Sequence, residues 1–330
     1  MEIAFLTGAT GFIGHHVARA LIERGWRVRA LRRSTSAHPA QLPGIEWTVG
    51  DMRNPEQIAG AMDGVNAVFH IAADYRLWVR DPREIYASNV DGTVNVLQAA
   101  LAAGVERVVY TSSVGALGLP PDGTPADENT PVRLEDMVGH YKRSKFLAER
   151  EAERFWTKGL PIVFVHPSTP VGPGDHKPTP TGKIIVDFLN RKMPAFLDTG
   201  LNLIDVRDVA EGHCLALERG KPGEKYILGN RNLTLEKILN ILASVSDVPA
   251  PRFRLPYGPV LWLARFFNVI SKVTGTEPLI PYEGVKMAAR HMFFDASKAV
   301  RELGLPQTPV ETALEDAVKW FYSNGYVSAR

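Results

Sequence analysis

The sequence predicts an α/β protein with a Rossmann-type, doubly wound parallel sheet and a smaller C-terminal substrate domain. Three observations predict it. An apolar run at Ile3–Leu6 ends in a series of spaced glycines, and further apolar runs alternate with helical patterns along the first half of the chain. Tyr141 and Lys145 then stand four residues apart in a helical pattern after the fifth apolar run. Ligands of such sheets bind at the carboxyl ends of the strands.

The first predicted unit is strand, glycine turn, helix and strand. Ile3–Leu6 reads as a buried strand, 12–24 as an amphipathic helix, and 27–31 as the next strand. Glycines between the first two elements let the backbone approach a pyrophosphate at the positive end of the helix. An ordinary turn would also use glycines, but it would not require the complete β-α-β pattern. The candidate cofactor residues of this turn are Gly8, Thr10, Gly11, Phe12, Ile13 and Gly14.

Arg32, Arg33 and Ser34 follow the second predicted strand. In NAD-selective folds an acidic residue here binds the ribose 2′-hydroxyl, whereas arginine suits a 2′-phosphate. The absence of a nearby carboxylate therefore favours NADP(H), with NAD(H) possible. The alternative is a solvated basic turn.

Two further strands, 45–49 and 67–73, supply the other candidate cofactor contacts. Asp51 follows the first of them, next to Met52, and could accept a hydrogen bond from the adenine amino group. Ile71, Ala72 and Ala73 end the second strand with residues small enough for a cofactor to lie against the backbone. His70 lies inside the apolar run, so we expect a packed core histidine rather than a base.

The candidate catalytic residues lie in two predicted elements. Tyr141 and Lys145 belong to a helix over 140–156, and Ser112 and Ser113 end a strand over 108–113. A spacing of four puts both side chains on one helix face. A neighbouring ammonium lowers the pKa of a phenol, so Tyr141 can exchange a proton with a carbonyl or alcohol oxygen. Ser113 would hydrogen-bond the same oxygen, with Ser112 as the alternative.

The alternative is that Tyr141 and Lys145 are surface residues with this spacing by chance, because a Tyr and a Lys occur four residues apart in many proteins. Their position after the fifth strand of a nucleotide-binding fold favours catalysis. Asn89, in the helix before that strand, is a further candidate that could fix the geometry of the catalytic residues. The alternative for Asn89 is an ordinary polar helix residue.

Together these motifs resemble the extended short-chain dehydrogenase/reductase family. Within it the chain is similar to the bacterial hopanoid-associated sugar epimerases and to dihydroflavonol 4-reductases. The resemblance rests on 7–14, Gly50-Asp51, 70–73, 89–93, 111–113, Tyr141-x-x-x-Lys145, 166–173 and 205–210. It implies a catalytic set of Ser113, Tyr141 and Lys145. It also implies cofactor contacts at Tyr141, Lys145, His166, Pro167 and Thr169, and substrate contacts at Tyr75, Ser113, Val114, Tyr141, Ser168 and Thr169.

The predicted function is an NADP(H)-preferring oxidoreductase that transfers hydride at a secondary alcohol or ketone of a sugar-like or cyclic substrate. The alternative in the same fold is a nucleotide-sugar epimerase that retains NAD. Arg32 and Arg33 count against it, because such epimerases usually carry an acidic residue there. An alternative of another class is a non-catalytic dinucleotide sensor, which could dispense with Tyr141 and Lys145.

The second half is less regular. We expect a loop over 167–180, helices over 183–191, 208–219, 233–246 and 310–322, and a strand over 226–229. The dinucleotide-binding domain is predicted over 1–166, with 202–230 and 293–300 returning to it. The substrate domain is predicted over 167–201 and 231–292, and 301–330 forms a helical closure. The resemblance suggests a homodimer.

The composition gives no sign of a nucleic-acid partner, so we expect the partner to be a small-molecule substrate. The formal net charge of +2 gives no electrostatic case for nucleic acid. The single cysteine, Cys214, excludes an internal disulfide and, with an N-terminus that starts directly in a strand, favours a cytoplasmic protein. The histidines show no metal-ligand spacing.

One apolar stretch, 260–270, is too short and too interrupted to span a bilayer. Its simplest interpretation is a helix that packs its aromatic face inward. The alternative is an apolar lip for a lipid-like substrate or a contact with a membrane surface. Exposure of Trp262, Phe266 and Phe267 distinguishes the two.

Overall fold

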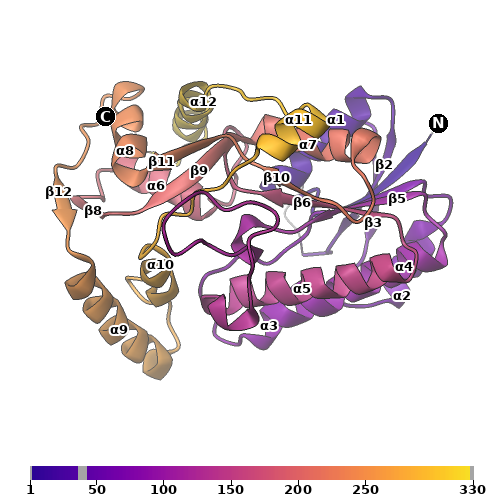
Figure 1. Ribbon diagram of the computed structural model, residues 1–330, viewed down its shortest axis with the longest axis horizontal. Coiled ribbons are helices and arrows are strands. Elements are labelled where there is room, and N and C mark those ends of the chain that lie inside the picture. The colour runs from indigo at the N-terminus through magenta and orange to yellow at the C-terminus, as the bar shows by residue number, and fades with distance from the viewer. Residues whose placement is uncertain (1, 36–42, 328–330) are drawn as a thin grey trace.

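A seven-stranded parallel sheet forms the centre of the protein, which is described here from a computed structural model (Figure 1). The structure describes residues 2–35 and 43–327, so the outermost residues of the predicted domains lie outside it. The strand order is β10-β6-β5-β4-β1-β2-β3. The strands are β1 (Ile3–Thr7), β2 (Arg27–Arg32), β3 (Ile45–Val49), β4 (Ala67–His70), β5 (Arg107–Thr111), β6 (Ile162–Pro167) and β10 (Lys225–Leu228).

Helices cover both faces of this sheet, which confirms the predicted Rossmann-type, doubly wound architecture (Figure 1). One face is covered by α1 (Phe12–Glu23), α7 (Val206–Arg219) and α11 (Ser297–Leu303). The other is covered by α2 (Glu56–Ala59), α4 (Gly92–Ala102) and α5 (Gly139–Thr157), with α3 (Arg83–Tyr86) leading toward α4. The strand order reverses beside β1, so the crevice for a ligand lies at the carboxyl ends of β1 and β4.

A second group of elements packs around its own apolar core. It contains a three-stranded sheet of β7 (Thr169–Val171), β9 (Gly200–Asp205) and β11 (Arg231–Thr234) and a two-stranded sheet of β8 (Ala195–Leu197) and β12 (Phe253–Leu255). The helices of this core are α6 (Pro180–Leu189), α8 (Leu235–Ser244) and α12 (Val310–Ser323), whereas α9 (Tyr257–Thr274) and α10 (Tyr282–Met287) contact each other outside it. The C-terminal helix α12 contacts α6 and α8 and contributes to this second core.

Several predicted boundaries differ from the observed ones for a local reason. The strand expected over 67–73 ends at His70, because the Thr7 hydroxyl accepts hydrogen bonds from the backbone N–H groups of Ile71 and Ala72. Those two amides therefore leave the sheet ladder. The loop expected over 167–180 contains β7, which pairs with β9. Thr234 caps α8, and its hydroxyl accepts a hydrogen bond from the Lys237 amide.

The inward-packing interpretation of 260–270 is wrong. These residues belong to α9, and the side chains of Trp262 and Phe266 are exposed, whereas Phe267 is half-buried. In Figure 1, α9 lies at the lower left edge of the molecule, away from the large sheet. Within 2–35 and 43–327, no helix has both the length and the apolar character that crossing a membrane requires.

Candidate active site

The glycine turn after β1 is shaped by close backbone approach. Gly8 has a φ of +81°, and a Cβ added there would lie 2.7 Å from the Ala72 nitrogen. A Cβ on Gly14 would lie 2.1 Å from the Gly8 oxygen. The N-terminus of α1 follows at Gly11, which supplies no side-chain cap, so its backbone N–H groups suit a phosphate. The turn therefore has the close backbone approach and the uncapped N–H groups that a dinucleotide pyrophosphate requires.

A buried chain of hydrogen bonds supports this turn from below. Thr7 Oγ1 already accepts from two backbone amides, so it donates to Nδ1 of His70, 2.7 Å away. His70 Nε2 then donates to Thr93 Oγ1 at 2.9 Å, and Thr93 donates to the Asn89 carbonyl at 2.6 Å. Each hydroxyl has its direction fixed by its neighbours, so His70 must be neutral with the proton on Nε2. His70 is thus a buried structural histidine, as the sequence analysis expected.

Burial lowers the pKa of His70 to about 3, with a further contribution from the charge of Lys145. The unfolded chain binds a proton at this histidine below about pH 6.5, whereas the folded chain does not. His70 therefore contributes stability above pH 6.5, and this contribution is lost as the pH falls. The slope is about 1.4 kcal/mol per pH unit, or about 2.7 kcal/mol between pH 6.5 and 4.5.

We expect the His70→Gln variant to lose that part of the pH dependence. Chemical unfolding of both proteins at several pH values between 6.5 and 4.5 gives the free energy of unfolding at each pH. The comparison is between the slopes of this free energy against pH, not between its absolute values. The slope for the variant should be smaller by about 1.4 kcal/mol per pH unit, which corresponds to one proton taken up on unfolding. Equal slopes in the two proteins would contradict a neutral, buried His70.

Asn89 reaches the catalytic helix through one intermediary. It lies in η2 (Ala87–Asp91), a single π-helical turn before α4, where an altered backbone often serves a functional site. Its amide exchanges hydrogen bonds with the backbone of Asp74 and donates to Ser144 Oγ at 2.9 Å. Ser144 Oγ donates to the Tyr141 carbonyl at 2.8 Å. Asn89 thus ties the segment after β4 to the start of α5, which makes it a positioning residue in this structure.

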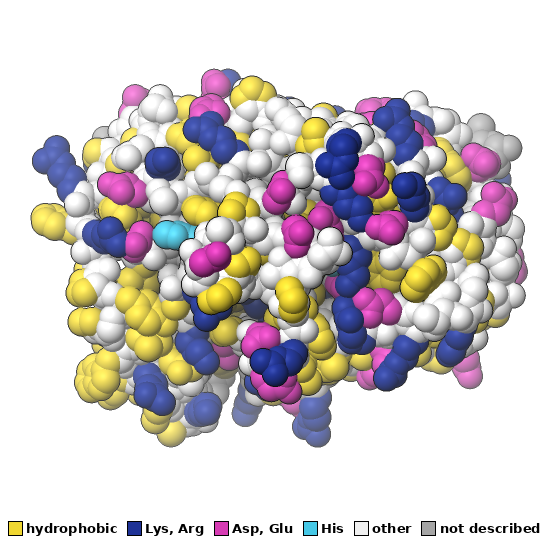
Figure 2. Space-filling model, in the orientation of Figure 1, with side chains coloured by type: hydrophobic (Ala, Val, Ile, Leu, Met, Phe, Trp, Pro, Cys, Tyr) yellow, Lys and Arg dark blue, Asp and Glu magenta, His cyan; other side chains and the backbone are white. Residues whose placement is uncertain are grey.

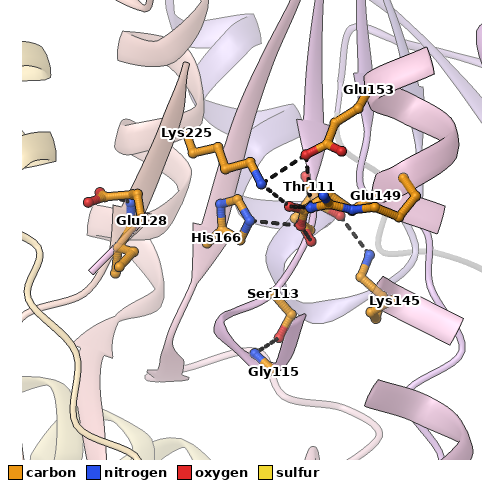
Figure 3. A network of polar contacts seen from close by, with 12 residues as sticks. Thr111, Ser113, Gly115, Glu128, Lys145, Glu149, Glu153, His166 and Lys225 are labelled. Atoms are coloured by element: carbon orange, nitrogen blue, oxygen red, sulfur yellow. Dashed lines mark hydrogen bonds and ion pairs between the residues drawn. The ribbon is translucent and has the colours of Figure 1, made fainter. Parts of the chain in front are cut away.

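Ser113, Tyr141 and Lys145 come together at the carboxyl end of β5. Tyr141 and Ser113 are both half-buried, and the Ser113 hydroxyl accepts from the Gly115 amide at 3.0 Å while lying near enough to the Tyr141 phenol to influence its pKa. Lys145 is buried, and its Nζ donates to the Thr111 carbonyl at 2.7 Å (Figure 3). Ser112, the alternative to Ser113, is buried and donates to Glu149 instead. The alternation of side chains along an extended segment explains why adjacent serines face different surroundings.

The ionisation of this group differs from the expectation for Tyr141. Burial raises the pKa of the Tyr141 phenol, and the nearby Ser113 hydroxyl offsets only part of the rise. Burial also lowers the pKa of Lys145 to about 8, although the charge of Glu149 opposes this. The Lys145 ammonium is directed at a backbone carbonyl, so it does not depress the pKa of Tyr141 here. The phenol is therefore held in its protonated form, the form that donates a proton.

A buried ionic network lies one turn beyond Lys145 on α5. The Glu149 carboxylate accepts hydrogen bonds from Ser112, from His166 Nε2 at 2.8 Å and from Lys225 Nζ at 2.6 Å (Figure 3). Burial raises the pKa of Glu149, but the charge and hydrogen bonds of His166 and Lys225 outweigh it and hold the pKa well below its usual range. The network joins α5 to β5, β6 and β10.

Sequence reasoning missed Glu149, although a signal for it exists. Residues 141, 145 and 149 follow at spacings of four, which places all three on one helix face. His166, a candidate cofactor contact, directs its imidazole into this network. Pro167 ends β6 and is buried.

The carboxyl end of β2, where the adenosine end of a dinucleotide is expected, carries two arginines. Arg32 ends β2, and Arg33 and Ser34 follow it as exposed residues. Within the described part of the chain, no ion pair uses either arginine. Asp51 is engaged instead by Arg53, whose Nη2 lies 2.6 Å from Oδ2 and whose hydrogen bonds lower the pKa of the carboxyl.

The neighbouring Met52 packs against the start of α4, where a Cβ on Gly92 would lie 2.9 Å from Met52 Cγ. Its carbonyl accepts from the Asn95 amide at 3.0 Å. Met52 is therefore fixed between the end of β3 and α4, beside the adenosine end of the crevice.

The other candidate substrate residues lie on several different segments. Tyr75 donates to the Lys177 carbonyl, and burial raises its pKa to about 12, with smaller contributions from nearby groups that include Tyr141. Ser168 and Thr169 are half-buried at the junction of β6 and β7, and Val114 is buried next to Ser113.

Lys142, which sequence reasoning also missed, follows Tyr141 and donates to Met292 Sδ at 3.6 Å. Its aliphatic chain lies against Gly115, in the turn that follows Ser113. Burial lowers the pKa of its ammonium to about 8. Lys142 therefore places a cationic side chain next to the turn that follows Ser113.

Comparisons with known proteins agree with this geometry. The family model described as the NAD dependent epimerase/dehydratase family matches residues 4–229. A Synechocystis sp. protein, named provisionally as a dihydroflavonol 4-reductase, is 49% identical and covers 99% of this chain and 96% of its own. Sterol demethylase protein B of Methylococcus capsulatus is 33% identical over 98% of this chain and 99% of its own. The crystal structure of a nucleoside-diphosphate-sugar epimerase from Pseudomonas aeruginosa superposes with a TM-score of 0.82, 28% identity and 99% coverage of both chains.

Proposed function

Because the chain belongs to the NAD-dependent epimerase/dehydratase family of extended short-chain dehydrogenases/reductases, we propose that it is an NADP(H)-preferring oxidoreductase. It acts at a ketone or secondary alcohol of a sugar-like or cyclic substrate. Enzymes of this family use a nicotinamide dinucleotide, and the glycine turn, the helix N-terminus at Gly11 and the small residues Ala72 and Ala73 fit that group. When bound, the nicotinamide supplies or accepts the hydride.

Side chains of this protein would transfer the proton that accompanies the hydride. In the reductive direction the Tyr141 hydroxyl donates its proton to the carbonyl oxygen as the carbonyl carbon gains the hydride. Ser113 holds the same oxygen by a hydrogen bond, which stabilises its developing negative charge. Lys145, one turn along α5, is the proposed cofactor contact beside Tyr141. In the oxidative direction the same groups act in reverse.

The preference for NADP(H) is carried by Arg32 and Arg33 at the end of β2. They follow the strand that pairs with β1, so they flank the glycine turn on the side of the adenosine ribose. A guanidinium binds a phosphate through charge-assisted hydrogen bonds worth about 1.5–3 kcal/mol. The 2′-phosphate of NADP(H) supplies such a group, whereas NAD(H) does not.

We expect the Arg32→Ala/Arg33→Ala variant to bind NADPH about 10- to 100-fold more weakly, with NADH affinity unchanged. Fluorescence titration of both cofactors measures the effect. Arg27→Ala is the matched control, because Arg27 begins the same strand and pairs with Glu46 at the opposite end of the sheet. The proposal fails if the wild-type protein binds NADH as tightly as NADPH.

The NAD-retaining epimerase is the second candidate, and the match to a nucleoside-diphosphate-sugar epimerase structure favours it. An epimerase oxidises and then reduces the same substrate, so it gains from keeping its cofactor. Mass analysis of the cofactor released from the purified protein separates the two. Stoichiometric, co-purifying NAD would support the epimerase, and exchangeable NADPH would support the reductase.

A further inference from the structure

Helix α9 carries an apolar stripe that faces away from the protein. Trp262, Phe266, Val269 and Val273 are exposed by 70, 51, 59 and 84%, respectively. Their spacings of four, three and four residues place them on one helix face. Ala264 and Ser271 are buried on the opposite face. The helix therefore packs on the protein through one face and presents large apolar side chains on the other.

The apolar surface extends beyond the helix at both ends. Phe253, in β12, is 73% exposed and Leu279, after α9, is 79% exposed. Figure 2 shows hydrophobic side chains gathered at the lower left of the molecule, where Figure 1 places α9, with Lys and Arg side chains among them. Contiguous apolar surfaces of this kind mark contacts with another protein or with a membrane. We name Phe253, Leu279 and the stripe on α9 the α9 patch.

The charge of the segment around α9 indicates whether a protein or a membrane covers the α9 patch. No Asp or Glu occurs between Asp247 and Glu277, whereas the interval contains Arg252, Arg254, Arg265 and Lys272. Arg254 is paired with Asp198. The other three are exposed and form no ion pair with any described residue. The α9 patch is therefore apolar at its centre and cationic around it.

The positions of the cations on α9 favour a membrane over a protein partner. Arg265 and Lys272 are seven residues apart, so they lie on one side of α9, about a quarter turn from the apolar stripe. A helix that lies in a membrane interface has this arrangement, with apolar and aromatic side chains in the acyl boundary and cations at the anionic headgroups. We propose that α9 docks the protein on the surface of a bilayer that contains anionic lipids.

A second copy of the chain is a weaker occupant. A two-fold dimer through this surface would bury the two apolar stripes against each other. It would leave Arg265 and Lys272 without partners, because the segment has no carboxylate to offer them. An anionic headgroup layer compensates both cations.

A cleft on the inner side of α9 reaches the residue that precedes Tyr141. Asn268, Ser271 and Thr274 of α9 line a cleft of about 420 Å³ that His140 also lines. His140 precedes Tyr141. Docking through α9 would thus hold this cleft near the lipid surface.

Vesicle flotation tests the proposal with the intact protein. We expect binding to vesicles of phosphatidylcholine mixed with phosphatidylglycerol, weaker binding to phosphatidylcholine alone, and a decrease with added salt. The Trp262→Glu/Phe266→Glu variant should bind the mixed vesicles at least about 10-fold more weakly. Val300→Glu/Tyr322→Glu is the matched control, because these residues are 39 and 41% exposed on α11 and α12, outside the α9 patch. The control should bind like the wild type.

A charge variant tests the cationic flank separately and avoids large changes to the apolar surface. Arg265→Gln/Lys272→Gln should lose the preference for anionic vesicles while keeping the wild-type melting temperature. The proposal is overturned if the wild type does not float with mixed vesicles, or if the Trp262→Glu/Phe266→Glu variant floats equally well. It is also overturned if sedimentation shows a dimer that this variant abolishes, with no binding to vesicles.

Discussion

Replacing Tyr141 by phenylalanine is expected to lower kcat by about 10²- to 10⁴-fold, because the proposed acid–base group is removed from the reacting oxygen. The ring stays in place, so α5 and the glycine turn should keep their geometry. Affinity for the dinucleotide should therefore change little. Steady-state kinetics with a ketone substrate, together with a cofactor titration, measure the two effects separately.

Tyr226→Phe is the matched control for this experiment. Tyr226 is a buried tyrosine of β10 whose hydroxyl accepts from the Lys221 amide and donates to Glu302, so the variant loses a hydrogen-bonded tyrosine hydroxyl outside the proposed site. It should keep wild-type kcat. Full turnover by the Tyr141→Phe variant would contradict the proposed mechanism. Loss of cofactor binding in that variant would assign Tyr141 a role in holding the dinucleotide.

Replacing Glu149 by alanine is expected to lower the free energy of unfolding by about 3–5 kcal/mol, because it leaves buried partners without their counter-charge. The carboxylate is 1% exposed and is the shared acceptor for Ser112, His166 and Lys225. Its removal also loosens α5 from β5, β6 and β10. Urea unfolding at pH 7, followed by circular dichroism, measures the loss.

Glu153→Ala provides a closely matched comparison. Glu153 lies one turn further along α5 and pairs with the same Lys225 at 2.9 Å, but its side chain is 27% exposed. Water can therefore replace the lost partner, and we expect a loss of about 1 kcal/mol or less. Similar losses in the two variants would show that burial of Glu149 is not the source of its contribution.

The large sheet and the glycine turn could be predicted from the sequence because they depend on short-range patterns. Ile3–Leu6, the three glycines and the helix after them define strand, turn and helix within about twenty residues. The spacing of Tyr141 and Lys145 likewise fixes their common helix face. The strand expected over 67–73 was too long, because the Thr7 hydroxyl, far away in the sequence, removes two amides from the ladder.

The candidate site residues could be named from the sequence, but their interactions could not. The sequence left Ser112 open as the alternative to Ser113, whereas in the structure Ser112 donates to Glu149 and Ser113 lies beside Tyr141. The expected effect of Lys145 on Tyr141 was not found, because the ammonium donates to Thr111 and burial governs both pKa values.

The sequence by itself determined the α/β architecture, the dinucleotide turn and the candidate catalytic residues, since backbone periodicity and glycine conformation act between near neighbours. Only the tertiary structure decided that Asn89 reaches Tyr141 through Ser144, that Glu149 is buried among three partners, and that the apolar face of α9 is exposed. The physical reason is that burial and hydrogen-bond partners depend on which distant segments pack together. An amphipathic pattern identifies an apolar face, but it does not identify what covers that face.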